Sequence, residues 1–66
     1  MTYTQHQYRM VMQERRLSYI QKMYILSALD AHLNQTGRPA VEFLIDRFQV
    51  DSEREIALNL FRQLCS

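Results

Sequence analysis

The sequence predicts a small all-α domain in which one long helix is followed by a shorter helical pair, and two copies form a dimeric helical bundle. Apolar residues recur at helical spacing along most of the 66 residues. The chain has a single glycine and a single proline, which stand together at Gly37 and Pro39. Because these residues interrupt helices, we expect long helical stretches on both sides of that point. The length fits one domain, residues 1–66.

The first helix is predicted over residues 4–34. Thr4 and Gln7 have the spacing of a capping box, in which a hydroxyl and an amide side chain satisfy free backbone groups of the first turn. No glycine or proline follows until Gly37, which suits the left-handed position after a helix. Pro39 suits the first turn of the next helix. The sequence therefore places its clearest boundary between residues 34 and 39.

The shorter pair is predicted over residues 39–49 and 52–64. Ser52 and Glu55 repeat the capping-box spacing at the start of the second member. In each helix the apolar residues recur every three or four positions, which predicts one buried stripe. The stripes consist of Val41, Leu44, Ile45 and Phe48 in the first, and of Ile56, Ala57, Leu60, Phe61 and Leu64 in the second.

The long helix carries two apolar faces when its residues are placed at 100° each, the helical step. The first stripe consists of Tyr19, Met23, Leu26, Leu29 and Leu33. The second consists of Leu17, Ile20, Tyr24, Ala28 and Ala31. A surface helix of a monomer needs only one such face. The second face therefore needs a cover of its own.

Length limits what can cover this second face. A helix of about thirty residues extends ~45 Å, whereas a compact chain of this size has a radius of gyration near ~11 Å. The shorter pair can cover one face only, so either a second chain covers the other or the helix breaks near residues 14–18 and folds back. The absence of glycine and proline there favours the second chain. We therefore predict a homodimer whose contact face consists of Leu17, Ile20, Tyr24 and Ala28.

No catalytic or nucleotide-binding motif is present, which predicts a protein that is not an enzyme and uses no cofactor. The nearest approach to a hydrolytic set is Ser27, Asp30 and His32. His32 lies about 160° around the helix from Asp30, so the three side chains do not converge. A small chain without a glycine loop or a cleft-forming sheet also rarely organises a reactive site.

Metal binding and disulfides are not expected either. His6, His32 and Cys65 lack the paired spacing that would place them on one zinc ion. Glu42 and Asp46 are one turn apart, but two carboxylates without further ligands are typical of a solvated helix face. Cys65 is the only cysteine, so no disulfide can form within the chain. A small domain without these supports often relies on oligomerisation, in agreement with the predicted dimer.

Composition and charge indicate a folded, non-membrane protein. The chain is 47% hydrophobic and 23% charged, with a net charge of +1. Residues 1–26 carry four basic side chains and one acidic (+3), and residues 27–66 carry four basic and six acidic (−2). No apolar run reaches the ~18 residues of a membrane span, and no signal-peptide core is present. With a lone thiol, these observations predict a cytoplasmic location.

The amino-terminal segment predicts a surface for another protein. Tyrosine, methionine and arginine, which are common anchors of interfaces, are concentrated there. The candidate contact residues are Tyr8, Arg9, Met12, Arg15 and Arg16. The expected function is that of a small regulator, adaptor or inhibitor that binds a larger protein. A small helical chaperone or assembly subunit is an alternative on the same grounds.

A second alternative is a dimeric DNA-binding regulator. Residues 44–51 and the capped helix after them weakly resemble a helix-turn-helix, and its nucleic-acid contacts would be Arg54, Asn59 and Arg62. The sequence departs from that pattern at Ile45, where a small residue is usual, and at Gln49, where a glycine is usual. Two glutamates at the start of the helix would also face phosphates. An ordinary antiparallel helical pair accounts for the same residues. We favour it over DNA binding, because DNA binding needs a basic face.

Overall fold

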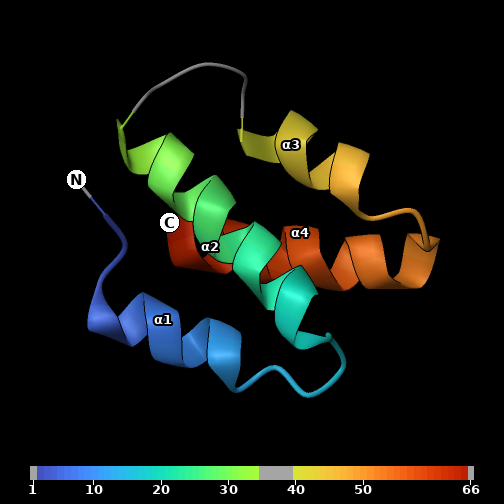
Figure 1. Ribbon diagram of the computed structural model, residues 1–66, viewed down its shortest axis with the longest axis horizontal. Helices are drawn as coiled ribbons and strands as arrows, with labels where there is room; N and C mark the ends of the chain where they lie inside the picture. Colours follow the sequence, from blue (N-terminus) through green and yellow to red (C-terminus); the bar gives the residue numbers. More distant parts are fainter. Residues whose placement is uncertain (1, 35–39, 66) are drawn as a thin grey trace.

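A computed structural model describes residues 2–34 and 40–65 of the chain. Within them it has no strand and four helices: α1 (Gln5–Met12), α2 (Tyr19–Asn34), α3 (Ala40–Arg47) and α4 (Asp51–Cys65) (Figure 1). The Cα radius of gyration is 10.7 Å and the principal extents are 28 × 24 × 20 Å. The all-α prediction is therefore confirmed. No helix in these two stretches is long and apolar enough to cross a membrane.

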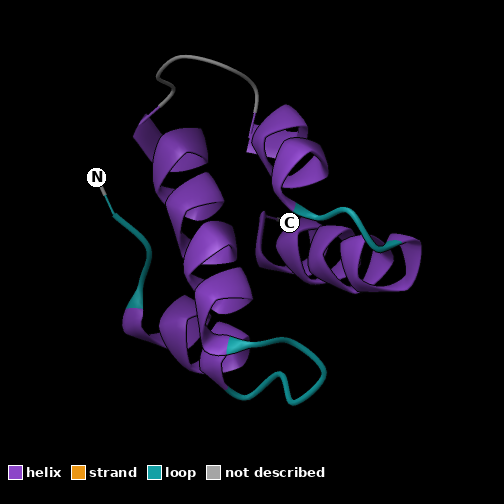
Figure 2. Cartoon of the chain, turned by 45° about the vertical axis from the view of Figure 1, so that its right-hand side comes forward, coloured by secondary structure: helices purple, strands orange, loops and turns teal. Residues whose placement is uncertain are grey.

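The single helix predicted over residues 4–34 is wrong. The chain leaves the helical path at residues 13–18, and α1 folds back beside α2 (Figure 2). Of the two ways in which the second apolar face could be covered, the structure therefore shows the break. The boundary predicted at Gly37 and Pro39 falls between α2 and α3, and these two residues lie outside the described residues.

Local polar contacts explain why the helix stops without glycine or proline. The backbone N–H of Ser18 donates to Oε1 of Gln21 over 2.8 Å, and the backbone N–H of Gln21 donates to Oγ of Ser18 over 3.3 Å. This is the reciprocal arrangement of a capping box at the start of α2. Nζ of Lys22 donates to the carbonyl oxygen of Met12, the last residue of α1, over 2.9 Å. The end of α1 and the start of α2 are therefore satisfied by side chains of Ser18 and of the first turn of α2.

The predicted start of the first helix is confirmed. The backbone N–H of Gln7 donates to Oγ1 of Thr4 over 3.1 Å, and the backbone N–H of Thr4 donates to Oε1 of Gln7 over 2.8 Å. Both capping boxes have the same spacing of Ser or Thr and Gln. The second one was overlooked because it lies inside a stretch that reads as continuous helix.

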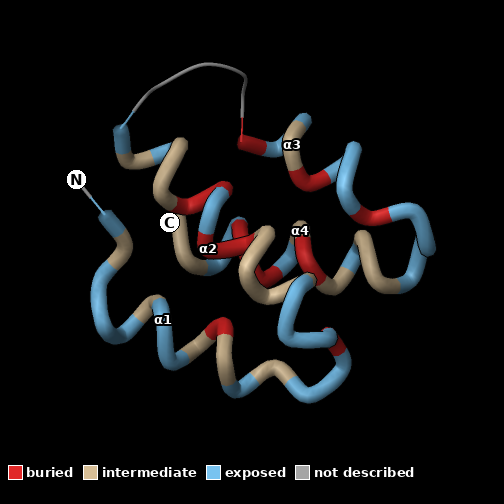
Figure 3. Tube along the Cα trace, viewed as in Figure 1, coloured by how far each residue is buried: buried red, intermediate tan, exposed pale blue. Residues whose placement is uncertain are grey.

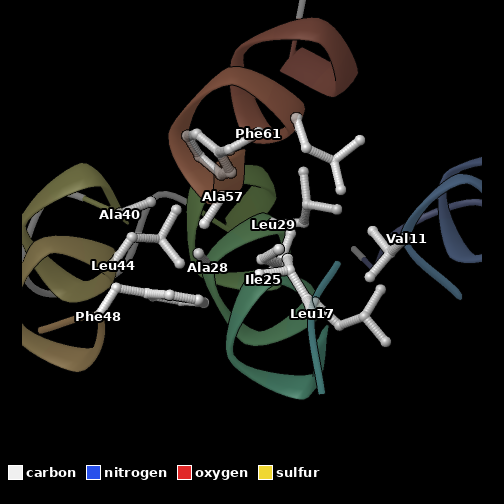
Figure 4. Packing of buried hydrophobic residues seen from close by; sticks show 12 residues of the cluster. Val11, Leu17, Ile25, Ala28, Leu29, Ala40, Leu44, Phe48, Ala57 and Phe61 are labelled. Carbon is white, nitrogen blue, oxygen red and sulfur yellow. The ribbon is translucent and has the colours of Figure 1, made fainter. Parts of the chain in front are cut away.

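α2 is the central helix and contacts each of the other three (Figures 1 and 3). Its apolar residues point to several sides, which is the pattern of a helix surrounded by protein. Figure 4 shows Val11 and Leu17 beside Ile25 on one side, and Leu44 and Phe48 near Ala28 on the other. The buried residues are Val11, Leu17, Ile25, Leu26, Ala28, Leu29, Ala40, Leu44, Phe48, Ala57, Leu60 and Phe61. The chain thus covers most of α2 by itself, while Tyr19 and Ile20 at its start stay 71% and 61% exposed.

The helical pair forms close to the predicted bounds. α3 ends at Arg47, two residues before the predicted end, and α4 begins at Asp51, one residue before the predicted start. Of the stripe predicted for α3, Leu44 and Phe48 are buried, but Val41 and Ile45 expose 39% and 44% of their surface. In the stripe of α4, three residues are buried and Ile56 and Leu64 are half-buried. The buried stripe of α3 is therefore narrower than predicted, because α2 and α4 cover only one side of this helix.

Candidate functional site

An open groove of about 400 Å³ lies between the turn that joins α1 to α2 and the outer face of α4. Two residues of the turn, Glu14 and Arg16, form one wall. The residues that α4 contributes are Ser52, Glu55, Ile56, Asn59, Leu60 and Gln63. They recur every three or four positions, so they share one helix face. The groove is thus built from two segments more than thirty residues apart in sequence.

The floor of the groove is apolar and its edges are polar. Leu60 exposes 7% of its surface and Ile56 is half-buried, so both present carbon atoms at the base. Ser52, Glu55 and Asn59 are exposed on α4 beside them. An apolar base with a few polar groups around it is the usual character of a binding site, because the base supplies affinity and the polar groups fix orientation.

A paired carboxylate and guanidinium set the position of the opposite wall. Nε of Arg16 donates to Oε1 of Glu14 over 2.8 Å, and Nη2 donates to Oε2 over 3.0 Å. The backbone N–H of Arg16 also donates to Oε1, over 3.1 Å. Such a two-pronged contact fixes orientation better than a single hydrogen bond does. Arg16 still exposes 67% of its side chain, so its outer surface is accessible from the groove.

The same contacts shift the acidity of Glu14. Hydrogen bonds from the side chain of Arg16, and then from its backbone, lower the pKa of Glu14 from 4.5 to about 2, with smaller contributions from the charges of Arg16 and Lys22. The pKa of Arg16 is raised for the reciprocal reason. Both groups are therefore charged at neutral pH, and the wall keeps its ion pair in mild acid.

This shift predicts a defined pH dependence of stability. Because the pKa of Glu14 is lower in the folded chain, the stabilisation is fully present above the unfolded pKa near 4.5 and is lost as the pH falls toward about 2. We expect Glu14→Gln to flatten the melting temperature profile across that window, by a few degrees only, because Arg16 exposes 67% of its side chain and solvent screens the pair. Thermal melts followed by circular dichroism from neutral to acidic pH measure this. A profile identical to that of the wild type would contradict the assigned role.

The structure disperses the residues predicted to contact a larger protein. Only Arg16 lines the groove. Tyr8 stacks on Tyr3 with ring centroids 6.3 Å apart and exposes 43% of its surface. Met12 is half-buried against the core, while Arg9 and Arg15 are exposed. The segment therefore supplies one member of the groove rather than a continuous interface.

The residues predicted as a dimer face do not share an outward surface. Leu17 and Ala28 are in the core, with 5% and 0% exposure. The Tyr24 ring meets those of Phe43 and Phe48 edge-on, at centroid distances of 6.3 and 6.2 Å. Only Ile20 is freely exposed, at 61%. A second chain would thus meet one residue of the predicted face directly.

The candidates for nucleic-acid contact also have separate roles. Nε of Arg54 donates to the carbonyl oxygen of Phe48 over 2.8 Å, and Nη1 lies 3.0 Å from Oδ1 of Asp51. Arg54 thus ties the start of α4 to the turn after α3. Asn59 lines the groove, and Nη1 of Arg62 donates to its Oδ1 over 3.4 Å. The first turns of α4 carry three acidic residues, which opposes binding to phosphates.

Metal and thiol chemistry find no support in the described residues. The two stretches contain no group of three His, Cys, Asp or Glu side chains placed to hold an ion. Cys65 is half-buried near the end of α4, and burial raises the pKa of its thiol. A raised pKa lowers the thiolate fraction, and the thiolate is the reactive form.

The sequence pattern indicates other roles for the groove residues of α4. Ser52 and Glu55 have the spacing of a helix cap, and Ile56 and Leu60 belong to the predicted core stripe. A signal for the groove was present in the mixed polar and apolar pattern along α4. Its second wall, however, depends on where the turn at residues 13–18 lies, and that required recognition of the break.

Comparison with known proteins leaves the site to be interpreted from its own geometry. No protein-family model, no curated protein and no solved structure matches the chain.

Proposed function

We propose that this chain is a small, non-enzymatic adaptor or regulatory domain that binds a segment of a larger protein in the groove between residues 13–18 and α4. The observation that carries the proposal is an apolar floor with polar walls, assembled from two distant parts of the chain. The charged pair of Glu14 and Arg16 holds one wall in place. A binding site of this kind needs no catalytic group.

The dimensions favour a short peptide segment. From Ser52 to Gln63 the helix face extends about 17 Å at 1.5 Å per residue. An extended peptide covers that length with about five residues, at roughly 3.3 Å each. Its backbone would meet polar side chains along α4, and one apolar side chain would lie on Ile56 and Leu60. Three charged residues line the groove, two acidic and one basic. We therefore expect the bound segment to carry a basic residue beside its apolar one.

Selection from a peptide library tests this proposal. The immobilised wild-type chain is used for selection, and Glu55→Arg is used to remove peptides that do not depend on the charge of the groove. We expect enriched sequences with one apolar and one neighbouring basic residue, and at least a tenfold weaker affinity for Glu55→Arg. The charge reversal turns the attraction between Glu55 and the basic residue of the peptide into a repulsion.

Mapping by amide chemical shifts locates the site independently. Addition of a selected peptide should perturb residues of the turn and the outer face of α4. Ile45→Ser provides the matched control, because Ile45 is 44% exposed on α3 and does not line the groove. Peptides that bind Glu55→Arg as tightly as wild type, or that perturb α3 instead, would refute the groove as the binding site.

The alternatives have less geometric support. The homodimer was inferred from two uncovered faces of a long helix, and α1, α3 and α4 now cover those faces of α2. For DNA binding, the short turn between α3 and α4 is favourable, but the acidic start of α4 and the internal contacts of Arg54 are not. An assembly or chaperone subunit would use the same groove and differs only in the partner that binds.

A further inference from the structure

The turn between α1 and α2 has the properties of a hinge. Residues 13–18 contain neither glycine nor proline. Gln13 already has helical angles, φ −78° and ψ −11°. The remaining five residues are ones that helices accept. The segment from Gln5 to Asn34 is therefore compatible with two backbone states, the folded-back hairpin and one continuous helix.

Few polar contacts hold the hairpin closed at the turn itself. They are the capping box of Ser18 and Gln21, the pair of Glu14 and Arg16, and the bond from Lys22 to the carbonyl oxygen of Met12. Leu17, also in the turn, is 5% exposed and packs beside Val11 and Ile25, as part of the surface that α1 shares with α2 (Figure 4). A continuous helix would lose the polar contacts and gain backbone hydrogen bonds across the same residues. Because local losses are matched by local gains, the balance depends mainly on what happens to α1.

α1 docks on the rest of the chain through a small complementary surface. Val11 is its only buried residue, with 0% exposure, and lies beside Leu17 and Ile25 (Figure 4). Nε2 of Gln7 donates to the carbonyl oxygen of Leu64 on α4 over 3.0 Å. If the turn straightens, α1 leaves this site and its apolar surface is uncovered. The segment that fits the vacated site is the α1 of a second copy, because the same residues already make these contacts.

We propose that two copies of this chain exchange α1, each with a continuous helix from residue 5 to residue 34, so that α1 of one copy occupies the α1 site of the other. Exchange of identical elements costs little because every docking contact is made again. It also accounts for a stretch that reads as uninterrupted helix and yet contains a capping box. Glu14 and Arg16 belong to the hinge, so exchange removes one wall of the groove. The exchange itself does not depend on the proposed function.

Distance measurement within one chain tests the proposal. Spin labels are placed at Gln5→Cys and Asn34→Cys in a Cys65→Ser background, and labelled chains are diluted with unlabelled ones. In a continuous helix the two backbones are about 44 Å apart, at 1.5 Å for each of 29 steps. In the closed chain the turn brings α1 back beside α2 within a body whose longest extent is 28 Å, so the two backbones lie much closer together. We expect the long distance in the dimer fraction and the short one in the monomer fraction, after separation by size.

Hinge variants provide the matched series. Ser18→Ala removes the cap of the closed state and so favours the open one. We expect the equilibrium between the two states to shift about fivefold per chain, which lowers the dimer dissociation constant about 25-fold. Arg15→Gly penalises the continuous helix and should weaken the dimer by a similar factor. Thr4→Ala is the control, because its cap is present in both states, and it should leave the constant unchanged.

Two outcomes would overturn the exchange. One is a dimer in which the distance within a chain stays at the short value of the monomer fraction. The other is the absence of any dimer of Ser18→Ala up to about 1 mM, the range of very weak association. Because these measurements contain no peptide, they leave the groove proposal to its own test.

Discussion

Replacement of Phe48 by alanine is expected to unfold most of the chain at room temperature. Phe48 is 1% exposed at the end of α3 and meets Tyr24 edge-on at 6.2 Å. Loss of a buried phenylalanine costs about 3–5 kcal/mol, because the surrounding structure only partly fills the cavity. A single small core supplies a net stability of roughly the same size. Urea titration followed by far-ultraviolet circular dichroism measures the loss.

Val50→Ala is the matched control for that substitution. Val50 lies two residues further along the same turn and is 54% exposed. Its replacement should change the free energy of unfolding by no more than about 0.5 kcal/mol. If both variants had similar stability, α3 would not be packed on α2 as described. Such a result would also contradict the described contact between Arg54 of α4 and the carbonyl oxygen of Phe48.

The sequence was sufficient for the helical class and for the start of α1, whereas the cap predicted at Ser52 is wrong because α4 begins at Asp51 and Ser52 lies within the helix. Thr4 and Gln7 predicted the first start correctly, and the apolar spacing of Leu44, Phe48 and Leu60 predicted their burial. The break at residues 13–18 was missed because absence of glycine and proline was weighed above the capping pair at the start of α2. A capping pair satisfies free backbone groups and is direct evidence for a helix start, whereas the absence of a breaker only permits a helix to continue.

Predictions that depend on how the helices pack were affected by the missed break. The two apolar faces of the long stretch were identified only in part, because Tyr19 and Ile20 are 71% and 61% exposed and Ile25, which belongs to neither face, is fully buried. Tyr24 of the second face packs on Phe43 and Phe48, and α1 covers the side of Ile25. The groove could not be predicted for the same reason, because Glu14 lies next to α4 only when the turn folds back. Val41 and Ile45 were assigned to a core stripe by spacing alone, and spacing does not reveal how wide a face the neighbouring helices cover.

A pair of substitutions on the two sides of the start of α2 decides between the packing of the hairpin and a dimer that joins through the face of Leu17 and Ile20. Leu17 is 5% exposed between Val11 and Ile25, whereas Ile20 is 61% exposed. In the hairpin, Leu17→Asp places an unpaired carboxylate in the core, which costs several kcal/mol, and the chain should lose its cooperative melt. Ile20→Asp leaves the charge in water and should change stability by about 0.5 kcal/mol or less.

The dimer that joins through this face predicts a different pattern for the same pair. There, Leu17 and Ile20 share one contact face, so either aspartate should separate the two chains while leaving a helical, soluble monomer. Circular dichroism and light scattering after gel filtration distinguish the two cases on the same samples. Equal effects of the two variants would favour a dimer that joins through the face of Leu17 and Ile20, which differs from the exchange of α1. A large effect of Leu17→Asp with a silent Ile20→Asp is what the hairpin requires, because only in the hairpin does Leu17 belong to the interior while Ile20 faces solvent.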